Sequence, residues 1–281
     1  MGVAQKMILE NNTLYEIEEI SAAPLALDEI WRGIEADEFI PYFQPKVSLR
    51  GMELAGVEVL MRWQHPQRGL LPAGAFLPAA EDNFLFDELT TVMLEKSIAQ
   101  CRRWKIQGVE VPVSVNISPD LLRDSGLAER IAAKVRAQHL QPSRLIIEVP
   151  ESAIAHDIGE ALENLVQLRV EGFGLAIDDF GTGHCVREQL ERIPASELKI
   201  DRKILSGATS RPALKSVLRQ SIELARELNV QAVAEGVESR EEWNLVNELG
   251  CDMAQGYFIA RPMAGEDLVS WVRVWTSDPF L

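Results

Sequence analysis

The chain alternates between short apolar runs and longer segments of helix-like composition. The apolar runs cover residues 111–116, 145–149, 175–178, 197–200, 231–234 and 253–258, and we expect a strand at each. The intervening segments predict helices over residues 85–105, 119–138, 152–171, 186–192, 211–228 and 240–249, two of which end at Gly172 and Gly250. Repeated strand–helix units of this kind predict a parallel sheet.

The first part of the chain has a different pattern. A short helix is expected over residues 27–37, with Asp28 as a capping residue, followed by strands over residues 39–47 and 54–62. The turn at Gly51 leaves a link so short that these two strands are expected to pair antiparallel, as a β-hairpin. Together with the later strands they make about eight, which favours a closed barrel. We therefore predict an α/β fold, a TIM-type (β/α)8 barrel.

The domain organisation follows from the same patterns. Residues 1–25 mix polar and apolar positions without a firm period, so we predict an N-terminal arm or linker there. Residues 26–281 are predicted to form one barrel domain, since barrels of this kind commonly stay undivided. Neither GxGxxG nor GxxxxGK[ST] occurs, so the sequence supports neither a dinucleotide-binding fold nor a P-loop.

Composition narrows the classes of partner. The formal net charge of −15 argues against a nucleic-acid polymer or an anionic membrane surface, because both bind basic faces. Cys101, Cys185 and Cys251 lie far apart without a CxxC pair, which indicates reduced thiols rather than a disulfide framework. The sequence has no apolar run of about 18 residues and no N-terminal leader pattern, so we expect a cytoplasmic protein without membrane insertion.

Polar residues occupy the positions where the predicted strands end. Asp178 and Asp179 follow an apolar run and precede a glycine-rich loop, although neighbouring carboxylates repel each other unless a cation or a shared proton lies between them. An ordinary Asp-rich turn is the alternative explanation. The other strand ends also carry polar residues, which in a barrel would converge on one mouth: Glu58, Arg62, Asn116, Glu148, Lys199, Asp201, Glu235, Glu238 and Gln255.

Taken singly, each of these residues also has a structural explanation, such as an ion pair or a turn. Together they would bury many carboxylates without counterions, at a large cost in free energy. Oxygen donors without cysteine or histidine select hard cations such as Mg²⁺ or Mn²⁺, and the candidates outnumber the ligands that one Mg²⁺ usually takes: Glu58, Asn116, Glu148, Asp178, Asp179 and Glu235. Two ions bridged by an aspartate, with Lys199 acting on a water and Arg62 on a phosphate oxygen, indicate metal-assisted phosphodiester hydrolysis.

Several short motifs follow one another along the chain. Residues 58–62 have the form ExLxR, with Val59 at the second position. Further blocks lie at residues 44–45 (QP), 115–118 (VNIS), 178–183 (DDFGTG), 199–201 (KID), 235–238 (EGVE), 255–257 (QGY) and 261–262 (RP). In this order they resemble the EAL-domain cyclic-di-GMP phosphodiesterases, over about residues 28–275. The resemblance implies a barrel with an antiparallel first strand, in agreement with the hairpin.

The resemblance also implies an activity and roles for single residues. It implies cleavage of cyclic di-GMP to the linear dinucleotide pGpG by two Mg²⁺ or Mn²⁺ ions, bound by Glu58, Asn116, Glu148, Asp178, Asp179 and Glu235. Besides Glu58 and Glu235, the implied catalytic set contains Lys199, which activates water, and Glu151, which steadies the loop after Asp179. Substrate contacts are implied for Gln44, Arg62, Asp201 and Gln255. A homodimer and a sensory or receiver domain N-terminal to this chain are further expectations.

Two segments depart from the family pattern. Pro150 replaces the threonine of the family's ExTE segment, which removes a hydroxyl and a backbone donor. The loop that links the metal centre to the dimer surface in active members of the family has a different sequence here, with His184, Cys185, Val186 and Arg187 in place of Tyr-Ser-Ser-Leu. We expect His184 to face solvent outside the site. The alternative to an active phosphodiesterase is therefore a catalytically weak or inactive cyclic-di-GMP receptor. A protein-interaction scaffold that binds no nucleotide is a third hypothesis.

Overall fold

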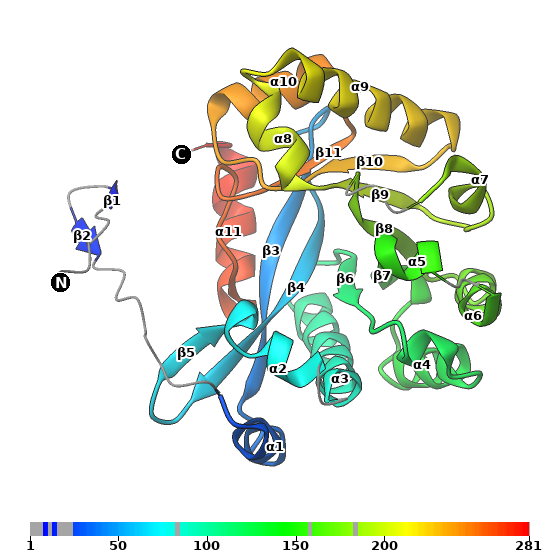
Figure 1. Ribbon diagram of the computed structural model, residues 1–281. Coiled ribbons are helices and arrows are strands. Elements are labelled where there is room, and N and C mark those ends of the chain that lie inside the picture. The colour runs from blue at the N-terminus through cyan, green and yellow to red at the C-terminus, as the bar shows by residue number, and fades with distance from the viewer. Residues whose placement is uncertain are drawn as a thin grey trace, which may run out of the picture.

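Eight strands close into a barrel in the computed structural model, which describes residues 8–10, 13–15, 25–81, 85–156, 159–181 and 185–280 (Figure 1). In order around the ring these strands are β3 (Phe39–Ser48), β4 (Leu54–His65), β6 (Val113–Asn116), β7 (Leu145–Pro150), β8 (Gly174–Phe180), β9 (Glu197–Ile200), β10 (Gln231–Ala234) and β11 (Met253–Gln255). β3 is antiparallel to both β4 and β11, whereas the other neighbours in the ring are parallel. The prediction of a TIM-type barrel with an antiparallel first strand is thereby confirmed.

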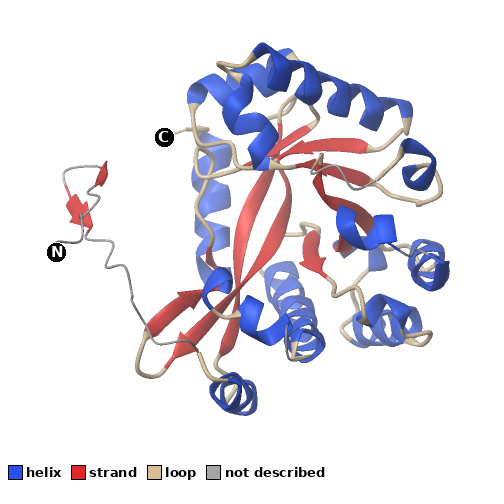
Figure 2. Cartoon of the chain, in the orientation of Figure 1, coloured by secondary structure: helices blue, strands red, loops and turns tan. Residues whose placement is uncertain are grey.

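Helices surround this barrel (Figure 2). The longer ones are α3 (Phe86–Ile106), α4 (Leu127–Ala137), α6 (Gly159–Val170), α9 (Pro212–Glu227), α10 (Arg240–Glu248) and α11 (Gly265–Ser277). The shorter ones are α1 (Leu27–Glu35), α2 (Leu77–Glu81), α5 (Glu151–His156), α7 (Arg187–Leu190) and α8 (Arg202–Ala208). No helix within the described ranges is long and apolar enough to cross a membrane.

Short additional strands lie at the edges. β5 (Gly69–Pro72) pairs with β4, and β12 (Met263–Ala264) pairs with β3. β1 (Ile8–Glu10) and β2 (Thr13–Tyr15) pair only with each other among the described strands. Most of the predicted N-terminal arm, residues 1–25, falls outside the described residues.

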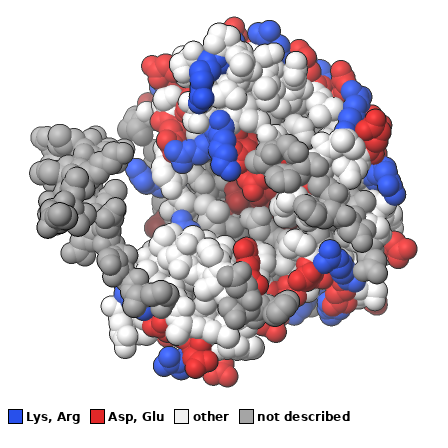
Figure 3. Space-filling model, in the orientation of Figure 1, with Lys and Arg blue, Asp and Glu red and all other residues white. Residues whose placement is uncertain are grey.

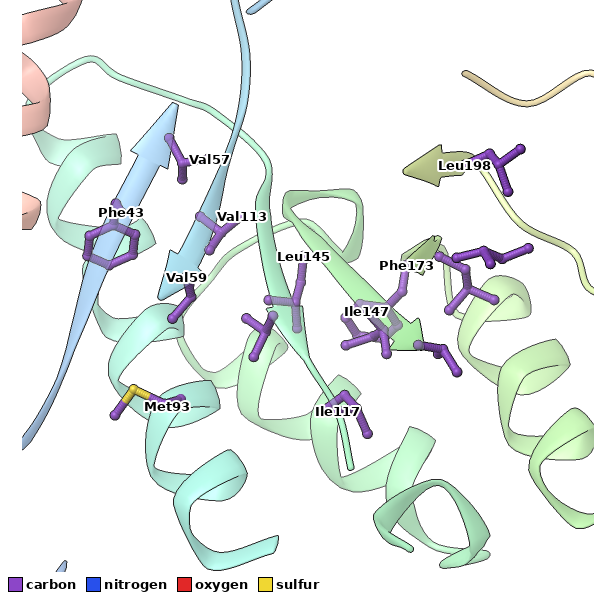
Figure 4. Packing of buried hydrophobic residues seen from close by; sticks show 14 of the residues in the cluster. Phe43, Val57, Val59, Met93, Val113, Ile117, Leu145, Ile147, Phe173 and Leu198 are labelled. Carbon is purple, nitrogen blue, oxygen red and sulfur yellow. The ribbon is translucent and has the colours of Figure 1, made fainter. Parts of the chain in front are cut away.

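The core lies between the strands and the surrounding helices. Val57 and Val59 on β4, Val113 on β6 and Met93 on α3 are all buried there (Figure 4). Side chains alternate along a strand, so the positions between these valines face the barrel interior, and Glu58 is one of them. The alternation that packs the helices onto the barrel therefore also directs polar side chains into its interior.

Several predicted elements have other bounds in the structure; β4, for example, extends to His65, beyond the expected end at residue 62. The single helix expected over residues 152–171 is two helices, α5 and α6, on either side of residues 157–158, which lie outside the described residues. The last barrel strand ends at Gln255, before the expected end at residue 258. At the next residue, Gly256, the backbone passes so close to Val237 that a Cβ would lie 2.1 Å from the Val237 carbonyl oxygen. β8 continues to Phe180, beyond the expected end at residue 178.

Three helices were not predicted, α2, α8 and α11, although the last two begin with a recognisable signal. Asp201 precedes α8, and its carboxylate accepts a hydrogen bond from the Lys203 backbone N–H at 2.6 Å. α11 has Glu266 and Asp267 in its first turn, where negative charge complements the helix dipole. Acidic residues at these positions are sequence signals for both helix starts.

Candidate active site

Lys199 lies at the centre of a ring of carboxylates inside the barrel. Its side chain is fully buried, and its Nζ atom lies 2.7 Å from Glu148 Oε2, 2.9 Å from Asp178 Oδ1 and 2.8 Å from Glu235 Oε1. The fourth carboxylate, Glu58, has its Oε2 atom 3.5 Å from the same nitrogen. These residues stand on β4, β7, β8 and β9 and directly after β10. The barrel thus brings together carboxylates that are far apart in the sequence.

Amide side chains orient Glu58. Asn116 Nδ2 donates to Glu58 Oε1 at 3.3 Å, and Gln255 Nε2 donates to Glu58 Oε2 at 2.6 Å. Gln255 Nε2 also lies 3.2 Å from Gln44 Oε1, and Gln44 in turn donates to the Ala260 carbonyl oxygen at 3.0 Å. Gln44 is paired directly with Glu58 in the register of β3 and β4. The predicted site residues Gln44, Asn116 and Gln255 therefore lie on the edge of the carboxylate ring.

β8 departs from regular strand geometry at the aspartate pair. Its pairing with β9 shifts between Ile177 and Phe180, and Asp179 has a φ of 55°. Adjacent residues on a regular strand face opposite sides of the sheet. This bulge and the left-handed backbone allow Asp178 and Asp179 to contribute oxygens to one cluster. Aspartate is among the residues that adopt this conformation most readily.

Two groups of carboxylates are close enough to hold metal ions. Within each group, one oxygen atom per residue lies within 4.8 Å of the others. One group is Glu58, Glu148 and Asp178, and the other is Asp178, Asp179 and Glu235. Asp178 belongs to both groups, which is the arrangement expected of a carboxylate that bridges two ions.

The charges and donor atoms of this cluster fit two divalent cations. Five carboxylates carry five negative charges, and the Lys199 ammonium supplies one positive charge, so four negative charges remain. Two divalent ions would cancel this excess. In addition, Glu148 Oε1 is buried with no hydrogen-bond partner in the part of the chain that the structure describes. A buried carboxylate oxygen in this state is stabilised by a cation.

The crowding of carboxylates changes their affinity for protons. Burial raises the pKa of Glu148 to about 8, with neighbouring carboxylates adding to the rise and Lys199 opposing it. Burial likewise raises the pKa of Asp179 to about 6. Burial alone would lower the pKa of Lys199, but the surrounding carboxylates raise it well above its ordinary value. The ring therefore contains a stable cation and several carboxylates that a further cation would keep ionised.

Glu151 lies beside the ring and holds the loop that follows β8. Its two carboxylate oxygens accept hydrogen bonds from the backbone N–H groups of Gly181 at 3.0 Å and Cys185 at 2.8 Å. The Cys185 thiol also donates to the Glu151 carbonyl oxygen at 3.3 Å. Glu151 thus fixes both flanks of residues 182–184. These three residues, with His184 and its expected exposure, lie outside the described residues.

Arg62 and Asp201 lie at the periphery of the ring. Arg62 follows Glu58 on β4 towards the mouth of the barrel; it donates to the Met61 carbonyl oxygen at 2.9 Å and its guanidinium lies 5.5 Å from the centre of the Tyr42 ring. Asp201 caps α8, and its negative charge contributes to the raised pKa of Asp179. Neither side chain is part of the two carboxylate groups.

Two hollows adjoin the ring. On the face shown in Figure 3, acidic side chains gather near the centre. The larger has a volume of about 650 Å³ and combines polar residues of the ring with apolar residues of β4 and α3: Asn116, Asp178, Asp179, Leu60, Met61 and Met93. The smaller has a volume of about 220 Å³ and is lined by Gln44, Glu58, Glu235 and Gln255, with Tyr257. A ligand that extends into both hollows would pass over the carboxylates.

Three polar residues deeper in the barrel were not predicted. Lys46 is fully buried; it donates to Ser114 Oγ at 2.8 Å and pairs with Glu197 Oε2 at 2.6 Å. The three residues, Lys46, Ser114 and Glu197, each stand two positions from a predicted site residue and on the same face of its strand. These neighbours are Gln44, Asn116 and Lys199, respectively. Strand alternation is therefore the signal that could have found them.

The comparisons with known proteins indicate one family. The protein-family model of the EAL domain matches residues 27–262 of the sequence. The cyclic di-GMP phosphodiesterase RocR of Pseudomonas aeruginosa is 38% identical over 253 residues, which are 90% of this chain and 64% of RocR. The bifunctional diguanylate cyclase/cyclic di-GMP phosphodiesterase MucR of the same organism is 36% identical over 247 residues, which are 88% of this chain and 36% of MucR. The chain thus spans between about a third and two thirds of these relatives.

A solved structure gives the same result at the level of the fold. The PaMucR phosphodiesterase in its c-di-GMP complex superposes with a TM-score of 0.82 at 36% identity, covering 86% of this chain and 98% of that chain. The family match extends from α1 to the segment after β11 and so includes every strand of the barrel. The chain therefore belongs to the EAL domain family.

Proposed function

We propose that this protein hydrolyses cyclic di-GMP to linear pGpG with two Mg²⁺ or Mn²⁺ ions held by the carboxylate ring. The observation that carries the proposal is the pair of carboxylate groups that share Asp178. The names of RocR and MucR support the choice of reaction, and the c-di-GMP in the PaMucR complex supports the choice of substrate. A complete set of oxygen donors favours turnover over nucleotide binding alone.

We assign six residues to the ions: Glu58, Asn116, Glu148, Asp178, Asp179 and Glu235. Two divalent ions, when bound, lower the pKa of a water and neutralise charge that develops on the phosphate. Oxygen donors from strands and strand ends suit Mg²⁺ and Mn²⁺, which prefer such ligands. Because these donors stand on or directly after paired strands of one sheet, their positions are set by the fold itself.

The remaining polar residues act on water and substrate. Lys199 Nζ lies within 3.5 Å of four carboxylates, so a water held among them meets this ammonium group; we assign to Lys199 the activation of that water, because its positive charge stabilises the hydroxide form. The water oxygen forms a bond to phosphorus while the P–O3′ bond breaks, which leaves a 5′-phosphate and a free 3′-hydroxyl in pGpG. We assign the binding of substrate to four residues around the ring: Gln44, Arg62, Asp201 and Gln255.

We assign Glu151 a positioning role, because its carboxylate binds the backbone of Gly181 and Cys185. The same bonds hold the chain next to Asp179, which stands two residues before Gly181. Loss of this carboxylate would therefore act on the metal site through the loop.

The proposal also covers the setting of the protein. We infer a homodimer in the cytoplasm, with a sensory or receiver domain N-terminal to the barrel. The greater length of RocR and MucR supports the last inference. Light scattering of the purified chain at several concentrations tests the dimer, since a mass of 31.4 kDa throughout would indicate a monomer.

The second candidate function is a catalytically weak or inactive cyclic-di-GMP receptor, which Pro150 and the residues after 183 favour because they depart from the family pattern. Incubation of the chain with cyclic di-GMP and Mg²⁺ or Mn²⁺, followed by separation of nucleotides, distinguishes the two. We expect pGpG to accumulate with metal and not with a chelator. Tight binding without pGpG would overturn the enzyme and support the receptor, whereas neither binding nor turnover would leave an interaction scaffold.

A further inference from the structure

A second buried lysine lies beneath the carboxylate ring. Lys46 on β3 is fully buried, and its Nζ atom contacts Ser114 Oγ on β6 at 2.8 Å and Glu197 Oε2 on β9 at 2.6 Å. A third neighbour, Glu148 Oε1 on β7, lies 3.9 Å from the same nitrogen. Lys46 thus connects three other strands of the barrel, and two of them, β6 and β7, carry proposed metal ligands.

Glu148 lies between the two buried lysines and contacts them unequally. Its Oε2 atom accepts a hydrogen bond from Lys199 at 2.7 Å. Its Oε1 atom faces Lys46 across 3.9 Å, which is beyond hydrogen-bonding distance, and has no hydrogen-bond partner among the described residues. Lys46 therefore attracts Oε1 without occupying its lone pairs.

The surroundings of Lys46 are suited to this arrangement. Glu197 pairs with Lys46, so the two together add no net charge to the interior. The ammonium still lies close to Glu148, and at short range in a low dielectric its attraction is appreciable. Gly56 on β4 provides the space, because a Cβ at that position would lie 3.0 Å from Lys46 Cε. The path of the lysine side chain through the barrel is therefore closely packed.

We propose that Lys46 is a positioning residue of the metal site: together with Glu197 and Ser114 it holds Glu148 so that Oε1 stays available to a divalent ion. The inference rests on the proposed function, since it takes Glu148 as a metal ligand. Lys46 touches neither ion nor substrate and acts through Glu148. The competing explanation is a structural ion pair whose loss changes stability and leaves metal affinity unaltered.

The test measures the binding of Mn²⁺ alone to the whole chain by isothermal titration calorimetry. The single variant Lys46→Met leaves Glu197 buried without its partner and can fail to fold. The informative variant is therefore Lys46→Met/Glu197→Met, which replaces the pair by apolar side chains of similar length. Lys134→Met is the matched control, because Lys134 forms an exposed ion pair with Glu95. Thermal unfolding of each variant monitors folding.

We expect the double variant to fold and to bind Mn²⁺ about 10- to 100-fold more weakly than the wild-type chain, as when other groups that orient metal ligands are removed. The turnover number at saturating Mn²⁺ should recover most of its wild-type value, since Lys46 does not touch the reacting atoms. If the double variant bound Mn²⁺ with wild-type affinity, the positioning role of Lys46 would be overturned, and the proposed function would stand. Absence of Mn²⁺ binding in the wild-type chain would overturn the proposed function and this role together.

Discussion

The carboxylates around Lys199 stand on or directly after four strands, whereas the two described flanks of the loop after β8, Gly181 and Cys185, are both held by Glu151. The register of the barrel sets the position of the ring, and several neighbours hold each member of it. The two flanks of the loop, by contrast, both donate backbone N–H groups to the same carboxylate. Loss of the Glu151 carboxylate would therefore release both described flanks at once.

This contrast explains why the departures from the family pattern can be compatible with activity. Cys185 reaches Glu151 through its backbone N–H, which every residue except proline can supply. Arg187 pairs instead with Glu191 and Glu227 on its own chain. The changed side chains that the structure describes thus leave the contact between loop and Glu151 in place.

The largest expected effect comes from the ring itself. Glu58→Ala removes a proposed metal ligand that Asn116 and Gln255 hold in place, and we expect turnover of cyclic di-GMP to fall more than about 100-fold. Release of pGpG under saturating metal measures the effect. Glu110→Ala, which removes an exposed partner of Arg144, is the control and should retain activity. Near-normal turnover in Glu58→Ala would show that Glu58 is not a metal ligand.

Replacing the metal tests the spacing of the ring without a mutation. Ca²⁺ is larger and prefers more ligands in a looser geometry, so it should fit poorly between two carboxylate groups that share Asp178. We expect turnover with Ca²⁺ to be more than about tenfold lower than with Mn²⁺, and Ca²⁺ to inhibit the Mn²⁺-loaded enzyme. Equal activity with both ions would contradict a two-ion site.

A smaller effect is expected where the loop joins the ring. Glu151→Gln replaces one accepting oxygen by an amide NH₂, so one of the N–H groups of Gly181 and Cys185 loses its partner. We expect turnover to fall about tenfold, with a higher Mn²⁺ concentration needed for half-maximal rate. Glu248→Gln on the exposed surface is the control. If the Mn²⁺ concentration for half-maximal rate did not change, the loop would have no influence on metal binding.

The smallest effect is expected at one of the changed positions of the loop. In Cys185→Ser the hydroxyl can donate to the Glu151 carbonyl oxygen as the thiol does, and the backbone N–H bond is retained. Turnover should therefore stay within about twofold of the wild-type value. A change of an order of magnitude would mean that the side chain at this position controls the site, contrary to the contrast drawn above.

The sequence predicted the barrel and most of the ring because the strand ends carry polar residues that the fold must collect. It did not predict the φ of 55° at Asp179 or the shifted pairing of β8, since both depend on the neighbouring strand β9. It also missed the pair of Lys46 and Glu197, which are 151 residues apart. A single charge on a strand has many explanations, and only the closed barrel shows that these two meet.

The most direct test of the two-ion site is anomalous diffraction from crystals of this protein soaked with Mn²⁺ and cyclic di-GMP. We predict two manganese peaks about 3.5–4 Å apart, with Asp178 between them and the phosphate of the nucleotide beside them. Manganese peaks away from the ring, or cyclic di-GMP bound over the ring without manganese, would contradict the two-metal phosphodiesterase.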